Sequence, residues 1–168
     1  MALIAICSDS HDNLVTIEKF LSYCNKNKIN FIIHCGDVTT KKTQELFIEK
    51  SKAPIEFVEG NADISKQDEF HRTNRFQKIK HLPVPYLDKT FDKIRIAACH
   101  QRDKAIRLAN KNEFDIVFYG HNHKPWKEKI ETTYIINPGN LAGMFYKATF
   151  ATYDTISKKL NLILVESL

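Results

Sequence analysis

The chain has 168 residues, 43% of them hydrophobic, which suits a single domain (residues 1–168) with one sizeable core. Its apolar runs are far shorter than the roughly 20 residues that span a bilayer, and the N-terminal run lacks the basic flank of a signal peptide, so we expect a cytoplasmic protein with no membrane partner. A formal net charge of +5 favours an anionic partner, although the basic residues are scattered and form no long run.

The first sixty residues alternate short β-rich runs with amphipathic stretches, a pattern typical of strand–helix–strand units and a parallel sheet. We predict strands over 3–7, 31–35 and 54–59 and helices over 13–27 and 40–51. In the first helix Leu14, Ile17 and Leu21 share one face, which predicts that this face is buried.

The second half is richer in strands and indicates a second sheet. Residues 64–88 are polar and irregular, and we interpret them as a segment that flanks the site. Strands are predicted over 90–99, 116–119, 134–136, 149–153 and 159–165, with one helix over 104–112. Residues 154–158 should form a hairpin connection, and the alternation of Leu160, Leu162 and Leu164 predicts a final strand with one buried face.

The cysteines and a small aromatic cluster are both expected in the core. No Cys-x-x-Cys pair occurs, and most of the cysteines lie in or beside apolar runs, which favours reduced core thiols over a zinc site or a redox pair. The four are Cys7, Cys24, Cys35 and Cys99. For Met144, Phe145 and Tyr146 we predict core packing, with an oligomer interface or the substrate mouth as alternatives.

Seven polar residues come just after predicted strands. They are Asp9, His11, Asp37, Asn61, His100, His121 and His123. Ligands of open α/β sheets bind beyond the carboxyl ends of the strands, so these side chains should converge although they are far apart in sequence. Glycine precedes three of the groups, at Gly36, Gly60 and Gly120, and permits sharp turns beside the polar side chains.

Carboxylate, imidazole and amide oxygen together form a donor set that suits Mn²⁺, Fe²⁺, Zn²⁺ or Ni²⁺. Seven ligands exceed the need of one ion. If Asp37 bridges, two ions receive four protein contacts each, and such a pair can clamp a phosphoryl group and generate a metal-bound hydroxide. Singly, each motif has a plainer explanation: Asp9 could cap the following helix, and the Gly-Asp and Gly-Asn pairs could be ordinary turns. It is the ordered combination that predicts a metal site.

The ordered motifs resemble the signature of the calcineurin-like metallophosphoesterase superfamily. They are Asp9-Ser10-His11, Gly36-Asp37, Gly60-Asn61, His100 and Gly120-His121-Asn122-His123, and the stretch Asn137-Pro138-Gly139-Asn140 is similar to a turn of its small bacterial and archaeal phosphodiesterases. The resemblance implies an α/β fold, a four-layer αββα sandwich of two mixed sheets flanked by helices. It also implies two ligand sets that share Asp37: Asp9, His11, Asp37 and His123 for the first metal, and Asp37, Asn61, His100 and His121 for the second.

Three positions depart from the family pattern. The histidine that many relatives carry after the Gly-Asn asparagine is absent, since Ala62 and Asp63 follow here. Gln101 stands where a glycine usually follows the single histidine, and Asn140 replaces a serine. All seven ligands are kept, so these departures bear on the substrate rather than on metal binding.

We therefore predict a metal-dependent phosphodiesterase that acts on a small phosphate ester. Its cofactors would be two divalent ions, Mn²⁺ first, with Ni²⁺, Zn²⁺ and Fe²⁺ as alternatives. The catalytic candidates are Asp37, Asn61, His100 and, as a proton donor to the leaving group, Asp63. A homo-oligomer is left open.

Two other functions stay open at this point. A non-catalytic scaffold, like the retromer subunit of eukaryotes with its similar fold, would use the same architecture for protein contacts. A nuclease acting on nucleic acid is suggested by the pI and by Arg72, Arg75, Lys78 and Lys80, although it is not favoured because no added DNA-binding domain is evident.

Overall fold

The computed structural model describes residues 2–64 and 85–168. Its elements are β1 (Leu3–Cys7), α1 (Leu14–Lys26), β2 (Phe31–His34), α2 (Lys41–Lys50), β3 (Ile55–Phe57), α3 (Asn61–Ile64), β4 (Leu87–Phe91), β5 (Ile94–Ala98), α5 (Arg102–Ala109), β6 (Ile116–Phe118), β7 (Trp126–Ile130), β8 (Thr133–Asn137), β9 (Thr149–Asp154), β10 (Leu160–Leu164) and the 3₁₀ helix η1 (Val165–Ser167). Among the described helices, none has the length and apolar character needed to cross a membrane.

The strands form two mixed five-stranded sheets. The first sheet has the order β10-β9-β1-β2-β3, and the second has the order β4-β5-β6-β8-β7. In the first sheet β1, β2 and β3 run parallel, while two strands from the far end of the chain complete it: β9 pairs antiparallel with β1, and β10 pairs antiparallel with β9. The predicted parallel sheet and the predicted second sheet are both confirmed.

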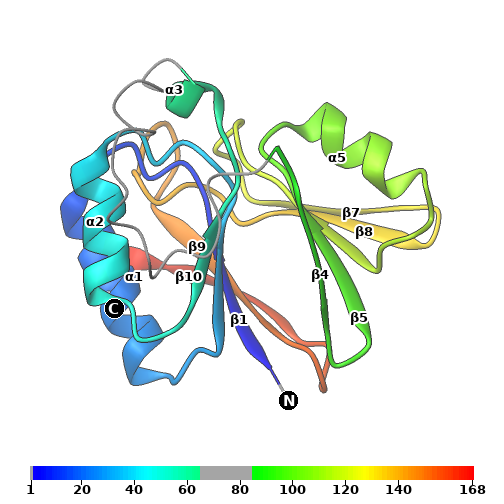
Figure 1. Cartoon of the computed structure of the whole chain (residues 1–168), viewed down its shortest axis with the longest axis horizontal. Coiled ribbons are helices and arrows are strands. Elements are labelled where there is room, and N and C mark those ends of the chain that lie inside the picture. The colour runs from blue at the N-terminus through cyan, green and yellow to red at the C-terminus, as the bar shows by residue number, and fades with distance from the viewer. Residues whose placement is uncertain (1, 65–84) are drawn as a thin grey trace.

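Helices cover the outer face of each sheet and produce the four-layer sandwich that was expected (Figure 1). Side chains alternate along β1, so that Ile4 and Ile6 face the second sheet while Ala5 and Cys7 face α1 and α2. On the far side, α5 packs against the outer face of the second sheet through residues such as Leu108. One apolar layer thus lies between the two sheets, one between the first sheet and its helices, and one between the second sheet and α5, as an αββα sandwich requires.

The helices predicted over 13–27 and 40–51 are confirmed as α1 and α2, and each predicted range also contains the capping residue at either end of the helix. Asn13 caps α1, where its side chain accepts a hydrogen bond from the Thr16 N–H, and Thr40 caps α2 in the same way. Asp9 is therefore not a helix cap, and its carboxylate is available for the site. All four cysteines are buried free thiols, as predicted.

The strand predicted over 90–99 is wrong, because the structure has a hairpin there. Strands β4 and β5 pair antiparallel, with Phe91 opposite Ile94, and a two-residue turn connects them. The turn residues Asp92 and Lys93 both have positive φ, at 46° and 72°, as tight hairpins require. Neither residue is the glycine or asparagine that usually marks such a turn.

Two further elements were not anticipated, and one burial pattern differs. Strand β7 is an exposed edge strand rich in Lys and Glu, so it carries no apolar run, and α3 begins at Asn61, which was predicted as a ligand beside a turn and not as the start of a helix. In β10, Leu162 and Leu164 are exposed, which contradicts the predicted buried face, because β10 is an edge strand with a neighbour on one side only. The segment predicted at 64–88 lies mostly outside the described residues.

His34 belongs to β2, as predicted, and its ring is completely buried in the first sheet. The ring lies 5.2 Å from that of Phe47 and 5.7 Å from that of Phe57, and its Nε2 lies 3.0 Å from the Ser10 hydroxyl. Burial lowers the pKa of His34 from 6.5 to about 3. The folded protein therefore keeps this imidazole neutral over a pH range in which the unfolded chain would protonate it.

This difference predicts acid lability. Because the folded pKa is depressed, the unfolded chain binds one more proton between pH 6.5 and about 3, so the free energy of unfolding falls as the pH falls through that window. We expect His34→Gln, measured by denaturant unfolding with a chelator present, to reduce the slope of this free energy against pH by roughly 1.4 kcal/mol per pH unit. Equal slopes in the two proteins would contradict the assignment.

Candidate metal centre

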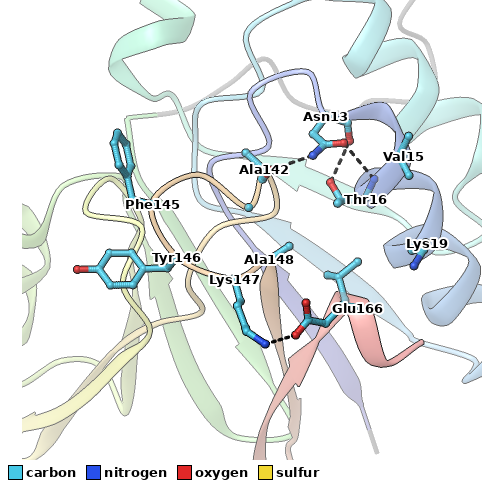
Figure 2. Close-up of a pocket in the computed structure, with 12 residues that line it drawn as sticks. Asn13, Val15, Thr16, Lys19, Ala142, Phe145, Tyr146, Lys147, Ala148 and Glu166 are labelled. Atoms are coloured by element: carbon cyan, nitrogen blue, oxygen red, sulfur yellow. Dashed lines mark hydrogen bonds and ion pairs between the residues drawn. The ribbon is translucent and has the colours of Figure 1, made fainter.

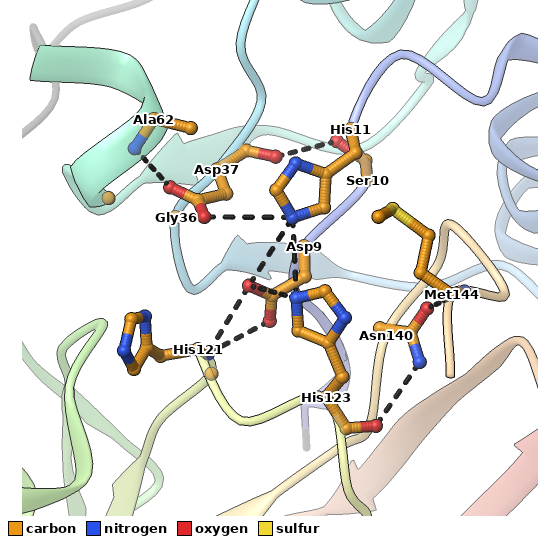
Figure 3. Close-up of polar contacts among 12 residues, drawn as sticks. Asp9, Ser10, His11, Gly36, Asp37, Ala62, His121, His123, Asn140 and Met144 are labelled. Carbon is orange, nitrogen blue, oxygen red and sulfur yellow. Dashed lines mark hydrogen bonds and ion pairs between the residues drawn. The ribbon is translucent and has the colours of Figure 1, made fainter. Parts of the chain in front are cut away.

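All seven side chains predicted as ligands meet at one end of the two sheets. They follow β1, β2, β3, β5 and β6, and their donor atoms fall into two groups. In the first group His11 Nε2 lies 3.3 Å from His123 Nε2 and 3.6 Å from Asp37 Oδ2, and His123 Nε2 lies 3.4 Å from Asp9 Oδ1. Figure 3 shows these four side chains pointing toward one another.

The second group surrounds His100. Its Nε2 lies 3.0 Å from Asn61 Oδ1, 3.2 Å from His121 Nδ1 and 3.4 Å from Asp37 Oδ2. Asp37 Oδ2 therefore lies within 3.6 Å of a histidine nitrogen in each group. Asp9 is also close to the second group, since donor atoms of Asp9, Asp37 and His100 lie within 4.8 Å of one another.

The two groups have a buried floor and an open rim. Asp9, Asp37, His100 and His123 are buried, whereas Asn61 and His121 are exposed. A buried floor raises the strength of electrostatic interactions because little water screens them. The exposed rim leaves a path by which an ion or a substrate can enter.

Five of the seven side chains stand on left-handed backbone. The φ angles are 51° at Asp9, 37° at His11, 61° at Asp37, 72° at His121 and 58° at His123. Residues other than glycine rarely adopt this conformation; each instance costs of order 1–3 kcal/mol and persists only where the surroundings enforce it. Such a concentration of strain at one place is typical of functional sites.

The three glycines serve the site in two different ways. Gly36 has a φ of +102°, which only glycine adopts readily. At Gly60 and Gly120 the reason is space: a Cβ would lie 2.1 Å from Asp37 Oδ1 at the former and 1.9 Å from Ser8 Oγ at the latter. The sequence-based interpretation of sharp turns therefore holds for Gly36, whereas close approach explains the other two.

Backbone hydrogen bonds lock the loops together. The Asp9 N–H donates to the Gly36 carbonyl at 3.0 Å, and the His11 N–H donates to the Asp37 carbonyl at 3.2 Å, which ties the loop after β1 to the loop after β2. The His121 N–H donates to the Asp9 carboxylate at 3.0 Å, which ties in the loop after β6. Ligand positions from distant parts of the chain are thus set by direct contacts.

A carbonyl oxygen fixes the tautomer of His100. Its Nδ1 lies 2.8 Å from the Cys35 carbonyl, which can only accept, so Nδ1 carries the proton. In the neutral ring Nε2 then carries the lone pair that could bind a cation, whereas in the protonated ring Nε2 donates to Asp37. Histidine ligands of metals are usually oriented by such a contact to the other ring nitrogen.

The electrostatics of the site favour added positive charge. Burial alone would lower the pKa of His100, but its hydrogen bond to Asp37 and the charges of Asp9 and Asp37 raise that pKa above the usual value. The pKa of His123 is raised chiefly by its hydrogen bond to Asp9. For Asp37, burial opposes ionisation, yet its contacts with His100 hold its pKa below the usual value. Clustered acceptors of this kind suit cations.

Asp63, predicted as a proton donor to the leaving group, is engaged by backbone groups of the site loops. Its buried carboxylate accepts the backbone N–H groups of Asp37 and Gly60 at 2.9 Å and of Thr39 at 2.8 Å. Burial raises its pKa, while these three bonds favour the ionised form. Both oxygens are occupied by the loops that carry Asp37 and Asn61, so Asp63 holds these two loops in position.

Sequence reasoning missed a similar role for Asp12. Its carboxylate accepts the hydroxyls of Thr39, Thr40 and Thr43, each at 2.5 Å. Asp12 thereby joins the loop after β1 to the start of α2. The three closely spaced threonines are a signal that sequence analysis could have used, since a carboxylate beside a strand end can accept from several hydroxyls.

The cluster of Met144, Phe145 and Tyr146 lies at the mouth of the site and not in the core. Their side chains are 43%, 87% and 45% exposed, which contradicts the predicted core packing. The ring of Phe145 lies 5.7 Å from the ring of His123. Of the alternatives considered from the sequence, the substrate mouth is the one that this position favours.

Comparison with known proteins finds phosphoesterases. A family model described as the calcineurin-like phosphoesterase superfamily domain matches residues 2–158. A phosphodiesterase of Methanocaldococcus jannaschii is 26% identical over 166 residues, which cover 97% of this chain and 99% of that protein. A probable metallophosphoesterase of the same archaeon is 27% identical over 148 residues, 82% of this chain and 67% of that protein.

Solved structures show the same architecture. The structure of an archaeal phosphodiesterase superimposes with a TM-score of 0.83 at 25% identity, covering 96% of this chain and 99% of that one. Vps29 of Chaetomium thermophilum superimposes with a TM-score of 0.72 at 17% identity, covering 98% of this chain and 92% of that one. At that identity the second likeness shows the fold alone.

The role of Asp63 can be tested with Asp63→Asn. In asparagine an NH₂ group replaces one of the two accepting oxygens, so at least one backbone N–H would face a donor and lose its hydrogen bond. We therefore expect a loss of about 1–3 kcal/mol in the free energy of unfolding. We expect Mn²⁺ affinity, measured by titration calorimetry, to fall roughly 10- to 100-fold because the loop of Asp37 is no longer held. The control is Asp103→Asn on the exposed face of α5. Unchanged stability and affinity in Asp63→Asn would refute the positioning role.

Proposed function

Because this chain belongs to the calcineurin-like phosphoesterase superfamily, we propose that it is a phosphodiesterase that works with two divalent metal ions. It is a metal-dependent hydrolase of phosphate esters. The finer assignment rests on one observation above the others: two groups of donor atoms approach each other at a single carboxylate oxygen, that of Asp37.

The residues present fit a pair of ions. Asp9, His11, Asp37 and His123 would hold the first, and Asp37, Asn61, His100 and His121 the second. The donors comprise four imidazoles, two carboxylates and one amide oxygen. Imidazole with carboxylate suits first-row transition ions better than Mg²⁺ or Ca²⁺, so we expect Mn²⁺, with Ni²⁺, Zn²⁺ and Fe²⁺ as alternatives.

When bound, such ions supply neutralisation of the phosphate oxygens and a water of lowered pKa. The chain's own residues prepare for this. Asp63 and Asp12 hold the loop of Asp37, and the Cys35 carbonyl keeps the proton of His100 away from the donor group. Asp9, buried completely, draws the His121 backbone toward the site. These contacts position donors before any ligand arrives, so little reorganisation is left for the reaction.

Two recesses flank the donor groups and support a diester as substrate. One of about 200 Å³ is lined by Asn61 and His100 of the second group, together with Gln101 and Lys104. The other, of about 540 Å³, has Phe145 on its wall, and the ring of Phe145 lies beside His123 of the first group. A phosphodiester carries two substituents, and each recess could take one of them.

The scaffold and nuclease alternatives make different demands. A scaffold has no need for seven donors, five of them on strained backbone, so the strain itself argues for chemistry. The basic residues that suggested a nuclease, Arg72, Arg75, Lys78 and Lys80, lie outside the described residues. Salt-dependent binding of DNA or RNA would favour a nuclease.

The proposed function is tested by metal reconstitution. Protein stripped of metal should hydrolyse bis(p-nitrophenyl) phosphate when Mn²⁺, Ni²⁺ or Zn²⁺ is restored, and faster than it hydrolyses p-nitrophenyl phosphate. Asp37→Asn should lose at least roughly 100-fold in kcat/KM, since it removes the carboxylate shared by both groups, whereas Asp103→Asn should match the native protein. Two ions bound per chain with no hydrolysis under any metal would instead support the scaffold.

A second prediction concerns the leaving group. With alanine at position 62 and Asp63 engaged by the backbone, we expect no side-chain proton donor for the departing oxygen. The logarithm of kcat/KM should therefore fall steeply as the leaving-group pKa rises through a series of substituted phenyl methyl phosphates. A flat dependence would reveal a general acid that this account lacks.

A further inference from the structure

The loop over residues 141–147 is anchored to the backbone of the site. Ahead of it, the Asn140 side-chain amide donates to the His123 carbonyl at 3.1 Å, and within it the Ala142 N–H donates to the Asp9 carbonyl at 3.0 Å. The Asn140 side-chain oxygen then accepts the Met144 N–H at 2.9 Å (Figure 3). The loop is therefore held in a fixed position relative to two of the proposed ligands.

This loop presents Phe145 in an unusual way. The residue has a φ of 63°, a conformation that aromatic residues rarely adopt, and its side chain is 87% exposed. Exposing a whole phenyl ring forfeits the burial that would stabilise it in the core. The ring lies 5.7 Å from that of His123 at an interplanar angle of 47°. The strained backbone thus places an exposed aromatic ring beside the proposed first metal.

A recess adjoins this face. Its volume is about 540 Å³, within the roughly 300–1,000 Å³ of small-molecule sites, and it lies between the loop and the start of α1. Figure 2 shows Asn13, Thr16 and Lys19 on the α1 side and Phe145 on the loop side. The recess thus combines an aromatic wall, a hydroxyl and a positive charge.

We propose that Phe145 is a stacking platform for a flat aromatic ring carried by the ester group that remains on phosphorus, so that the substrates are phosphodiesters with an aromatic substituent. This inference deepens the proposed phosphodiesterase function and depends on it. A nucleoside and a simple aryl group both provide such a ring. Phe145 borders both the donor group of His123 and the recess. The ester group that remains on phosphorus, if it extends past the first donor group, would therefore meet the ring before it enters the recess.

Three substrates with a common leaving group test the platform. They are thymidine 5′-(p-nitrophenyl) phosphate, phenyl p-nitrophenyl phosphate and methyl p-nitrophenyl phosphate. We expect the native protein to prefer the aromatic esters over the methyl ester. Phe145→Ala should reduce that preference, measured as the ratio of kcat/KM values, by roughly 5- to 150-fold, the range expected for loss of one stacking contact. If Phe145→Ala loses the preference for the thymidine ester alone, the ring in the natural substrate belongs to a nucleoside. If it loses the preference for both aromatic esters, the platform accepts aromatic groups in general.

The methyl ester separates the two proposals. If none of the three esters is hydrolysed under any metal condition, the phosphodiesterase assignment fails; if the methyl ester is hydrolysed equally by the native protein and Phe145→Ala while the aromatic preference persists, only the platform fails. Phe145→Trp should restore the preference, and Tyr134→Ala, which removes a partly exposed aromatic ring on β8 that lines neither recess, should leave it intact. An equal loss in Tyr134→Ala would show that the effect is not specific to Phe145 and overturn its role. Inhibition by thymidine 5′-monophosphate should weaken in parallel with the loss of preference.

Discussion

Left-handed backbone at the ends of β1, β2 and β6 is the constraint on which the rest of this molecule depends. It turns the chain so that side chains of residues as far apart as Asp9 and His123 point at one another. Such backbone is unfavourable by itself and persists only where surrounding contacts enforce it. Here two carboxylates supply much of that enforcement: the half-buried Asp12 accepts three threonine hydroxyls, and the buried Asp63 accepts three backbone N–H groups. The cost of burying these charges is offset by full hydrogen bonding.

The four-layer architecture explains why this constraint can be met. The first sheet delivers Asp9 and Asp37 from adjacent parallel strands, and the second delivers His100 and His123, so the site lies where two independent sheets end. The apolar layer between the sheets, with residues such as Ile6, fixes their relative position. A ligand set drawn from a single sheet would lie along one edge, whereas two facing sheets enclose a space from both sides.

Regular features of the fold, and the convergence of the seven polar side chains at the strand ends, could be predicted from the sequence because they depend on local patterns. The strand ending at Cys7 and the helix capped by Asn13 follow from alternation and capping chemistry. The hairpin turn at Asp92 and Lys93 could not be recognised, since neither residue announces a positive φ. The role of Asp63 also escaped prediction, because its partners are backbone amides whose positions are set only by the folded loops.

Metal binding and substrate choice depend on different residues of the site. The donor groups are determined by strand ends and by buried contacts, so a change at any of them disturbs several neighbours at once. Gln101 and Phe145, by contrast, are exposed residues that line the recesses beside the donors and take part in neither group. Such residues can vary without affecting the loops of Asp37 or His123. An exposed aromatic ring held on strained backbone is costly to maintain, and contact with a substrate is the benefit that would offset that cost. On the proposed function, specificity therefore belongs to the rim, where the exposed Gln101 is one of the positions at which this chain departs from the family pattern.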